Sequence, residues 1–429
     1  MNNSSSKVGL FQNGRFYYGW ILAALGFLLM LSVYVGAISI TSIFVVPVTE
    51  ALGVDRGEFL LYQTILCIAS VAITAYFGKK MDTKSIKPIM AISCLLGAVS
   101  YVIFANAQSI MMFYIFSVFI GAAFCNSSNL PVSVILNNWF GGKLKATVMG
   151  FVFIGSGIGG LTMLPFINHF IITYSYSAGY YVLAAIYVIS AILVLLLVVR
   201  TPEEKGFVRM GQDQAEEKLT NSAEKLGFTR AEAFKMPSFW LMCISCFLIV
   251  IGSSAILFNS APFYADVGFD AAMAARIASY NLGMLALGKP VIGFLCDKFG
   301  SKFGNLVGTI LFALTFLFLA LLPNNPDSLI YLVVFCYGIG GGILTVSLPN
   351  MVNALFGERE YGAIVSFNVM AANLGGAIGG TIAGFVYDIT GSYVAFWWFA
   401  FGIIILAVIL RLLAYALQKD FIVAKNNIE

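Results

Sequence analysis

The phrase that decides the fold is Gly293-Phe-Leu-Cys-Asp297-Lys298-Phe-Gly300-Ser-Lys302, because a similar phrase occurs earlier in the chain. The earlier copy reads Gly78-Lys-Lys-Met-Asp82-Thr-Lys84-Ser-Ile-Lys87, and Asp82 precedes Asp297 by 215 positions, about half of the 429 residues. Other landmarks keep nearly the same offset: Pro47, Gly53 and Asp55 recur as Pro262, Gly268 and Asp270, and Phe140-Gly141 recurs as Phe356-Gly357. The sequence therefore predicts two halves of similar structure.

The composition predicts that most of the surface contacts lipid. Hydrophobic residues make up 60% of the chain, aromatic residues 15% and charged residues 10%, far from the averages of soluble domains. A helix needs roughly 20 apolar residues to cross a bilayer. Twelve stretches qualify: 18–47, 57–78, 86–106, 110–136, 144–169, 177–199, 237–263, 271–294, 303–323, 327–350, 360–386 and 391–417.

The charges predict how the chain is oriented in the membrane. Most of the 24 Lys and Arg residues fall in the tails, the middle loop or the even-to-odd connections, which predicts that both termini are cytoplasmic. Acidic residues mark the opposite face, at Glu50, Asp55, Glu58, Asp266, Asp270, Asp327 and Asp388. The net charge of +4 therefore indicates topology, and nucleic-acid binding is not expected.

The expected fold is an all-α membrane protein of twelve transmembrane helices in two pseudo-symmetric halves. Two such halves that rock around a shared central site are typical of transporters. The mixed charge of the middle loop suits a surface helix or a solvated tether equally. The expected layout is a tail (1–17), a six-helix half (18–199), a cytoplasmic linker (200–236), a second half (237–417) and a tail (418–429).

The repeated phrase resembles the signature of the major facilitator superfamily, G-x-x-x-D-[RK]-x-G-x-[RK]. The second copy fits fully, whereas the first has Thr83 and Ser85 where basic and Gly residues are usual. The glycines allow close helix approach, and the Asp suits a neighbouring helix N-terminus. The resemblance implies a conformational gate formed by Gly78, Asp82, Gly293, Asp297, Lys298, Gly300 and Lys302.

Further motifs resemble the monocarboxylate and oxalate/formate carriers within that superfamily. They are Arg15-Phe-Tyr-Tyr-Gly19-Trp20, Trp139-Phe140, Met149-Gly150 and Gly155-Ser-Gly157-Ile-Gly159-Gly160. Close packing of helices explains the glycines equally well. The resemblance implies a transporter that works as a monomer. No cofactor and no metal are expected.

Lys289, in Gly288-Lys289-Pro290, is the best candidate for substrate binding. It is the only Lys or Arg judged to lie well inside a predicted span, about 12 Å from Asp297 at the helical rise per residue. An unpaired ammonium there costs about 2.5 to 3.5 kcal/mol, and the spans contain no acidic partner. A substrate carboxylate would supply the missing charge, although Lys289 could instead extend to the cytoplasmic interface. The family resemblance implies that a basic residue before this Pro contacts an anionic substrate.

Two departures from the resembled families bear on the substrate and on coupling. The oxalate/formate carriers have a second cation on span eleven, where this chain has Ala372 and Asn373, so a monocarboxylate is favoured over a dicarboxylate. The proton-coupled carriers have an Asp one turn before the basic residue, where this chain has Leu285. Exchange, uniport and proton symport through a titrating Lys289 therefore all stay open.

Polar residues elsewhere in the spans could complete the site. Asn126, Asn129, Ser133 and Asn137 recur at intervals of three or four, which predicts one polar helical face. Each is as well suited to hydrogen bonding between helices as to substrate binding. The other candidates are Tyr34, Thr41, Gln63, Asn259, Asn281 and Asn373.

The leading hypothesis is a carrier of small monocarboxylates, of the lactate, pyruvate or formate class, in the cell membrane. A proton or counter-anion is a possible second partner. Alternatives are a carrier of a larger amphipathic carboxylate such as a bile acid, a proton-driven efflux pump for cationic drugs, and a sensor that binds ligand without flux. Efflux would not depend on Lys289. An enzyme is disfavoured, since no His, Cys and acid cluster has metal or nucleophile spacing.

Overall fold

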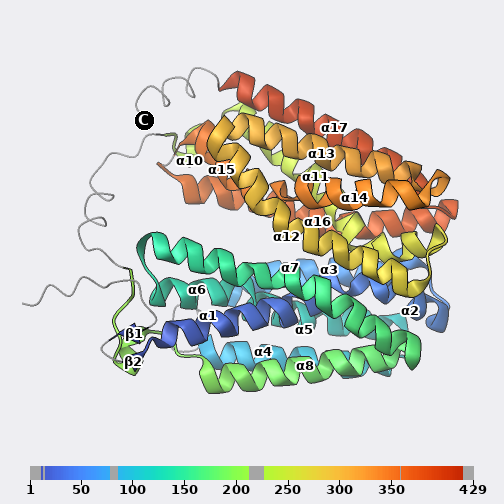
Figure 1. The fold of residues 1–429 in the computed structure, drawn as a ribbon, viewed down its shortest axis with the longest axis horizontal. Coiled ribbons are helices and arrows are strands. Elements are labelled where there is room, and N and C mark those ends of the chain that lie inside the picture. Colours follow the sequence, from blue (N-terminus) through green and yellow to red (C-terminus); the bar gives the residue numbers. More distant parts are fainter. Residues whose placement is uncertain (1–10, 13–14, 78–85, 212–226, 358, 419–429) are drawn as a thin grey trace, which may run out of the picture. The chain divides into compact units, whose positions relative to one another are not determined.

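The computed structural model describes residues 11–12, 15–77, 86–211, 227–357 and 359–418. These residues form helices and one short hairpin, whose strands β1 (Phe11–Gln12) and β2 (Arg15–Phe16) are antiparallel (Figure 1). The all-α class predicted from the sequence is confirmed.

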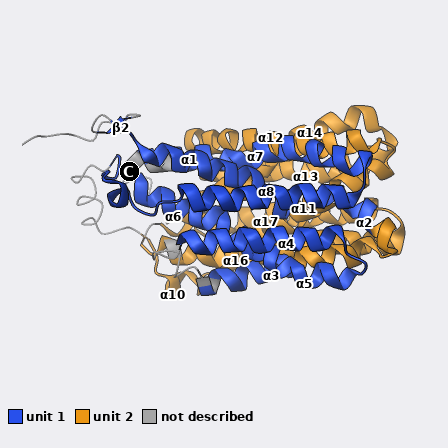
Figure 2. Cartoon of the chain, turned by 90° about the horizontal axis from the view of Figure 1, so that it is seen from below, with its two compact units in different colours: residues 1–48, 65–223 blue, residues 49–64, 224–429 orange. Residues whose placement is uncertain are grey.

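The chain divides into two compact units (Figure 2). Unit 1 comprises residues 1–48 and 65–223, and unit 2 comprises 49–64 and 224–429. Helix α3 (Arg56–Phe77) is continuous across this division, since its first nine residues group with unit 2 and the rest with unit 1.

Before the linker, the chain forms one π-helix, short 3-10 segments and long α-helices. The elements are α1 (Tyr18–Leu29), the π-helix η1 (Met30–Ser39), η2 (Thr41–Ile43), α2 (Val45–Leu52), α3, α4 (Ile86–Ala105), α5 (Ile110–Ser127), α6 (Asn129–Trp139), α7 (Gly142–Thr173), α8 (Tyr176–Leu197) and η4 (Pro202–Lys205).

After the linker, the helices follow in a similar order. They are α10 (Arg230–Ala233), α11 (Pro237–Asp266), α12 (Ala271–Phe299), α13 (Ser301–Leu321), η5 (Leu322–Asn324), α14 (Pro326–Gly341), α15 (Ile343–Phe356), α16 (Tyr361–Thr390) and α17 (Val394–Leu417).

Eleven segments among the described residues are long and apolar enough to cross a membrane. Helix α12 occupies the range expected for the eighth of twelve spans. Its polar residues, Asn281 and Lys289 among them, lower its apolar content, which explains why it is not counted with the eleven.

The same pattern of glycine packing occurs within each of the two units. In unit 1, Gly155 and Gly159 of α7 press against the backbone carbonyls of Phe27 and Leu31 in the first span. In unit 2, Gly375 and Gly379 of α16 press against the carbonyls of Phe247 and Ile251, and all four residues lie 220 positions after their counterparts. The predicted duplication therefore extends to individual contacts between helices.

Helix interruptions repeat as well. Ser128 separates α5 from α6 with φ −119° and ψ −117°, and Gly342, 214 positions later, separates α14 from α15.

The expectation that Asn126, Asn129, Ser133 and Asn137 share one helical face is wrong, because the first lies on α5 and the others on α6. Non-helical geometry at Ser128 changes the helical phase between them.

The π-helix η1 has no counterpart in α11, which is α-helical throughout. Its backbone accepts hydrogen bonds from two tyrosines: Tyr101 Oη donates to the Gly36 carbonyl at 2.7 Å, and Tyr187 Oη donates to the Val33 carbonyl at 2.8 Å. These hydroxyls anchor the irregular segment to α4 and α8. Segments of π-helix often occur at functional sites.

Candidate functional site

Lys289 lies at the level where the tenth span is interrupted. Its neighbour Gly288 packs against the backbone of Gly338 on α14, and Gly342 approaches the carbonyl oxygen of Gly288. This contact between backbones sets the position of α12 against α14. Interrupted helices are the usual location of substrate sites in transporters.

The Lys289 side chain is half-buried, and no described residue gives it a hydrogen bond or an ion pair. It is ten residues from the end of α12 at Phe299, or about 15 Å along the helix. A bound anion would supply the counter-charge that no described residue provides.

Polar candidates in unit 2 fall into two groups. Asn259 Nδ2 donates to the carbonyls of Ala255 and Gly380 at 3.1 and 3.0 Å, and Asn281 Nδ2 donates to Tyr264 Oη at 2.8 Å. Gln63 is 1% exposed, and its Nε2 lies 3.2 Å from Tyr62 Oη. Asn259 and Asn281 thus link helices, and Gln63 is enclosed. Asn373, by contrast, is exposed on α16.

Polar candidates in unit 1 divide in the same way. Asn126 is buried and donates to Ser93 Oγ at 3.1 Å, and Thr41 is 1% exposed. Ser133 Oγ donates to the Asn129 carbonyl of its own helix at 2.7 Å, and Asn129 is exposed. Tyr34 is half-buried in the π-helix, with its ring 5.5 Å from that of Phe124.

The judgement that Lys289 is the only cation well inside a span is wrong, because Arg411 of α17 is 2% exposed. Its Nη1 donates to Thr309 Oγ1 at 2.8 Å, and its Nε has no hydrogen-bond partner among the described residues. Arg411 is six residues from the end of α17, and its side chain points toward Thr309 of α13. Its position inside the predicted span 391–417 was the available signal.

Part of the predicted gate can be located. Gly78 and Asp82 lie outside the described residues. Gly300 has φ +88° between α12 and α13, a conformation that favours glycine. Asp297 and Lys302 are exposed, Lys298 Nζ lies 5.4 Å from the Phe294 ring centre, and Gly293 faces Val346.

The motifs around Tyr17 and Trp139 form a clasp at the start of the linker. Tyr17 Oη donates to the Trp139 carbonyl at 2.6 Å and accepts from the Met210 amide at 3.2 Å. The Tyr17 ring packs edge-on against Trp139, Phe140 and Phe207. Burial raises the pKa of Tyr17 to about 12, so the hydroxyl stays protonated and keeps donating at neutral pH.

Each end of the linker pairs with a repeated Phe-Gly step of its own unit. In unit 1, the Gly141 amide donates to the Met210 carbonyl at 2.8 Å. In unit 2, the Phe228 amide donates to the Phe356 carbonyl at 2.9 Å. Gly141 and Phe356 therefore bind the two ends of the linker through their backbone groups.

Tyr17→Phe is expected to lower the free energy of unfolding by about 1 kcal/mol, the net contribution of one hydrogen bond. The loss is modest because the Met210 amide also donates to the Trp139 carbonyl at 3.0 Å. Thermal unfolding of the detergent-purified protein measures it. Tyr174→Phe, at a 73% exposed position, is the control, and equal stability of the two variants would contradict the clasp.

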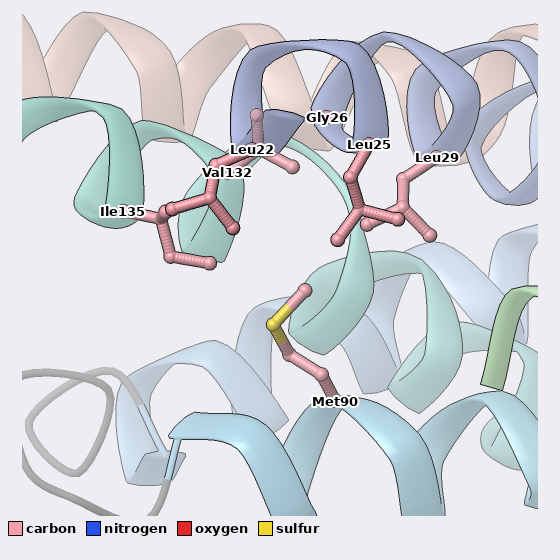
Figure 3. Close-up of a pocket in the computed structure, with 7 residues that line it drawn as sticks. All are labelled: Leu22, Leu25, Gly26, Leu29, Met90, Val132 and Ile135. Carbon is pink, nitrogen blue, oxygen red and sulfur yellow. The ribbon is translucent and has the colours of Figure 1, made fainter. Parts of the chain in front are cut away.

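An apolar pocket in unit 1 is a poor candidate for binding a carboxylate (Figure 3). It is a small space between α1, α4 and α6. Its lining is wholly apolar and offers no counter-charge: Leu22, Leu25, Gly26, Leu29, Met90, Val132 and Ile135.

Comparisons with known proteins place the chain in a family. The Major Facilitator Superfamily model matches residues 22–286 and 247–424. Monocarboxylate transporter 2 of Rattus norvegicus is 21% identical over 407 residues, 91% of this chain and 81% of that protein. The cis,cis-muconate transport protein of Acinetobacter baylyi is 27% identical over 74% of this chain and 76% of its own length.

The 4-hydroxybenzoate transporter PcaK of Acinetobacter baylyi is 32% identical over 165 residues, 37% of this chain and 35% of that protein. Among solved structures, the nucleoside transporter NupG superposes with a TM-score of 0.71 at 19% identity, covering 93% of this chain and 98% of that one. This similarity supports the fold predicted from the sequence.

Proposed function

Because the chain belongs to the Major Facilitator Superfamily, we propose that it is a secondary transporter that carries a small monocarboxylate by alternating access. The proposal places it in the cell membrane as a monomer, with both termini in the cytoplasm.

Lys289 carries the proposal. A half-buried ammonium without a described partner costs free energy in a membrane, and a carboxylate offsets that cost by a charge-assisted hydrogen bond. A cation-specific pump would gain nothing from a positive charge at this position. A single such lysine suits one carboxylate group, since Asn373 brings no second charge.

The named relatives support an organic acid as the substrate class. Three are named for monocarboxylate, 4-hydroxybenzoate and cis,cis-muconate transport, and 4-hydroxybenzoate and muconate are larger than lactate. A larger carboxylate is therefore the second candidate. In both cases, Lys289 is proposed to bind the carboxylate group of the substrate.

Counterflow in proteoliposomes tests the function. Vesicles loaded with one unlabelled acid are given radiolabelled lactate, pyruvate, formate, 4-hydroxybenzoate or muconate, with a cationic dye as the comparison. Accumulation of a monocarboxylate is expected, and dependence on an imposed proton gradient separates symport from exchange and uniport. Dye movement without carboxylate movement would favour efflux, and binding without flux would favour a sensor.

A further inference from the structure

A second pocket in unit 1 is lined by polar and charged side chains, unlike the apolar pocket described above. It lies where the linker begins, between the last turn of α6 and the chain that follows α8. The proposed function, which rests on Lys289 of unit 2, does not use it. The lining residues are Asn137, Asn138, Thr201, Pro202, Glu203 and Arg209.

Hydrogen bonds fix the two charged residues of this pocket to the surrounding backbone. Glu203 belongs to the short helix η4, where its carbonyl accepts from the Gly206 amide at 3.0 Å. Arg209 follows three residues after Gly206, and its Nε donates to the Phe140 carbonyl at 3.2 Å. The pocket therefore has one carboxylate and one guanidinium at defined places on its wall.

These two charges line the same pocket without forming an ion pair. The one ion pair found among the described residues lies in unit 2. Glu203 is exposed and Arg209 is half-buried. The Nη groups of Arg209 and the side-chain amide of Asn137 have no hydrogen-bond partner among the described residues. Donors and acceptors on this wall are therefore available to a ligand.

Opposite charges that are held apart in one pocket complement a ligand that carries both. An acidic group can accept hydrogen bonds from the free Nη groups of Arg209, and an ammonium group can donate to Glu203. Glu203 disfavours a purely anionic ligand, and Arg209 disfavours a purely cationic one. The Asn137 amide can donate to the acidic group or accept from the ammonium. Since a single charge contact near water is weak, the two contacts must be made together.

We propose that this pocket binds a zwitterion whose acidic and ammonium groups are a few atoms apart. The ligand can be the headgroup of a phosphatidylethanolamine lipid or a free amino acid, because both carry this pair of groups. Leu195 and Leu196, near the end of α8, are 47% and 69% exposed, as expected of apolar surface that lipid covers. Lipid headgroups therefore lie close to the pocket. The proposal does not depend on the substrate bound by Lys289.

Thermal unfolding of the detergent-purified full chain tests the site with phosphoethanolamine and with glycine. A ligand that binds the folded state raises the melting temperature. Both zwitterions are expected to raise it, whereas ethanolamine and methyl phosphate, which carry one charge each, are not. Glu203→Gln and Arg209→Gln should each raise the concentration that gives half of the shift by about tenfold, the effect of losing a hydrogen bond to a charged group. Lys289→Met should keep the native response to both zwitterions.

Native mass spectrometry distinguishes the two sources of the zwitterion. The protein is supplied with equal amounts of phosphatidylethanolamine and phosphatidylglycerol that have the same acyl chains. Selective retention of phosphatidylethanolamine by the native chain, and its loss in Glu203→Gln, would assign the site to a lipid headgroup. Stabilisation by glycine without selective retention of this lipid would assign it to a free amino acid.

Neighbouring charges that do not line the pocket provide matched controls. Glu204→Gln and Lys205→Gln change exposed residues of η4 and should leave zwitterion binding unchanged. Native-like binding in Glu203→Gln would overturn the proposal, as would an equal response to ethanolamine or methyl phosphate, or no binding of any zwitterion. Loss of the response in Lys289→Met would also overturn it, because the ligand would then occupy the transport site. Failure of carboxylate counterflow with normal zwitterion binding would count against the proposed function alone.

Discussion

Replacing Lys289 with Ala is expected to reduce carboxylate counterflow by roughly 100-fold, while Lys289→Arg keeps part of it. Removing one partner of a buried charge pair costs about 2 to 5 kcal/mol, and about 1.4 kcal/mol corresponds to a factor of ten. Arginine keeps the positive charge, but its larger planar guanidinium replaces the compact ammonium and changes the hydrogen-bond geometry. Initial rates of counterflow with a radiolabelled monocarboxylate measure the effect.

Removing the charge of Lys289 should raise stability even though it lowers transport. Lys289→Met keeps the apolar stem and removes the half-buried charge, so the substrate-free protein should melt at a higher temperature than the native one. Added carboxylate should then raise the melting temperature of the native protein and not that of the variant. Arg276→Met, on the exposed face of α12, is the matched control. Native-like counterflow in Lys289→Ala would remove Lys289 from the site.

The repeats made much of the fold predictable. The two copies around Asp82 and Asp297 predicted two similar halves, and apolar run lengths predicted where helices lie. The structure adds that glycine contacts and helix interruptions follow the repeat. A motif of glycines predicts close packing, but it does not identify the partner, because the partner is a backbone carbonyl that any residue provides.

The features that the sequence did not reveal depend on the tertiary structure. The interruption at Ser128 follows from a backbone conformation, whereas the spacing of Asn126 and Asn129 fits an unbroken helix equally well. Arg411 is buried because α17 turns it toward Thr309. The hydrogen bond from the Arg56 amide to Asp388 Oδ1 joins residues 332 positions apart, and no local pattern indicates such a pair. Lys289 could be singled out from the sequence because a lone charge in an apolar helix is a local signal, and its role in substrate binding stays a prediction.

The repeated glycine contacts predict large effects from the smallest possible substitution. A Cβ at Gly379 would overlap the carbonyl oxygen of Ile251, and one at Gly159 would overlap that of Leu31. Backbone atoms cannot move aside as a flexible side chain does, so the helices must separate. Gly379→Ala and Gly159→Ala are each expected to lower the free energy of unfolding by about 1 to 3 kcal/mol.

Each helix offers its own matched control for this prediction. A Cβ at Gly376 of α16 would lie 3.4 Å from a Val250 methyl group, an ordinary contact, and a Cβ at Gly150 of α7 would meet nothing within 4 Å. Gly376→Ala and Gly150→Ala should therefore be neutral or slightly stabilising, since Ala favours the helix over Gly by up to about 1 kcal/mol. Thermal unfolding in detergent measures these effects, and the two substitutions in each helix should shift the melting temperature in opposite directions. Equal stability of Gly379→Ala and Gly376→Ala would show that α11 and α16 are not held in backbone contact. Gly159 and Gly379 make the same contact in the structure, so both substitutions should be destabilising. Destabilisation by Gly379→Ala alone would limit the tight packing to the second half.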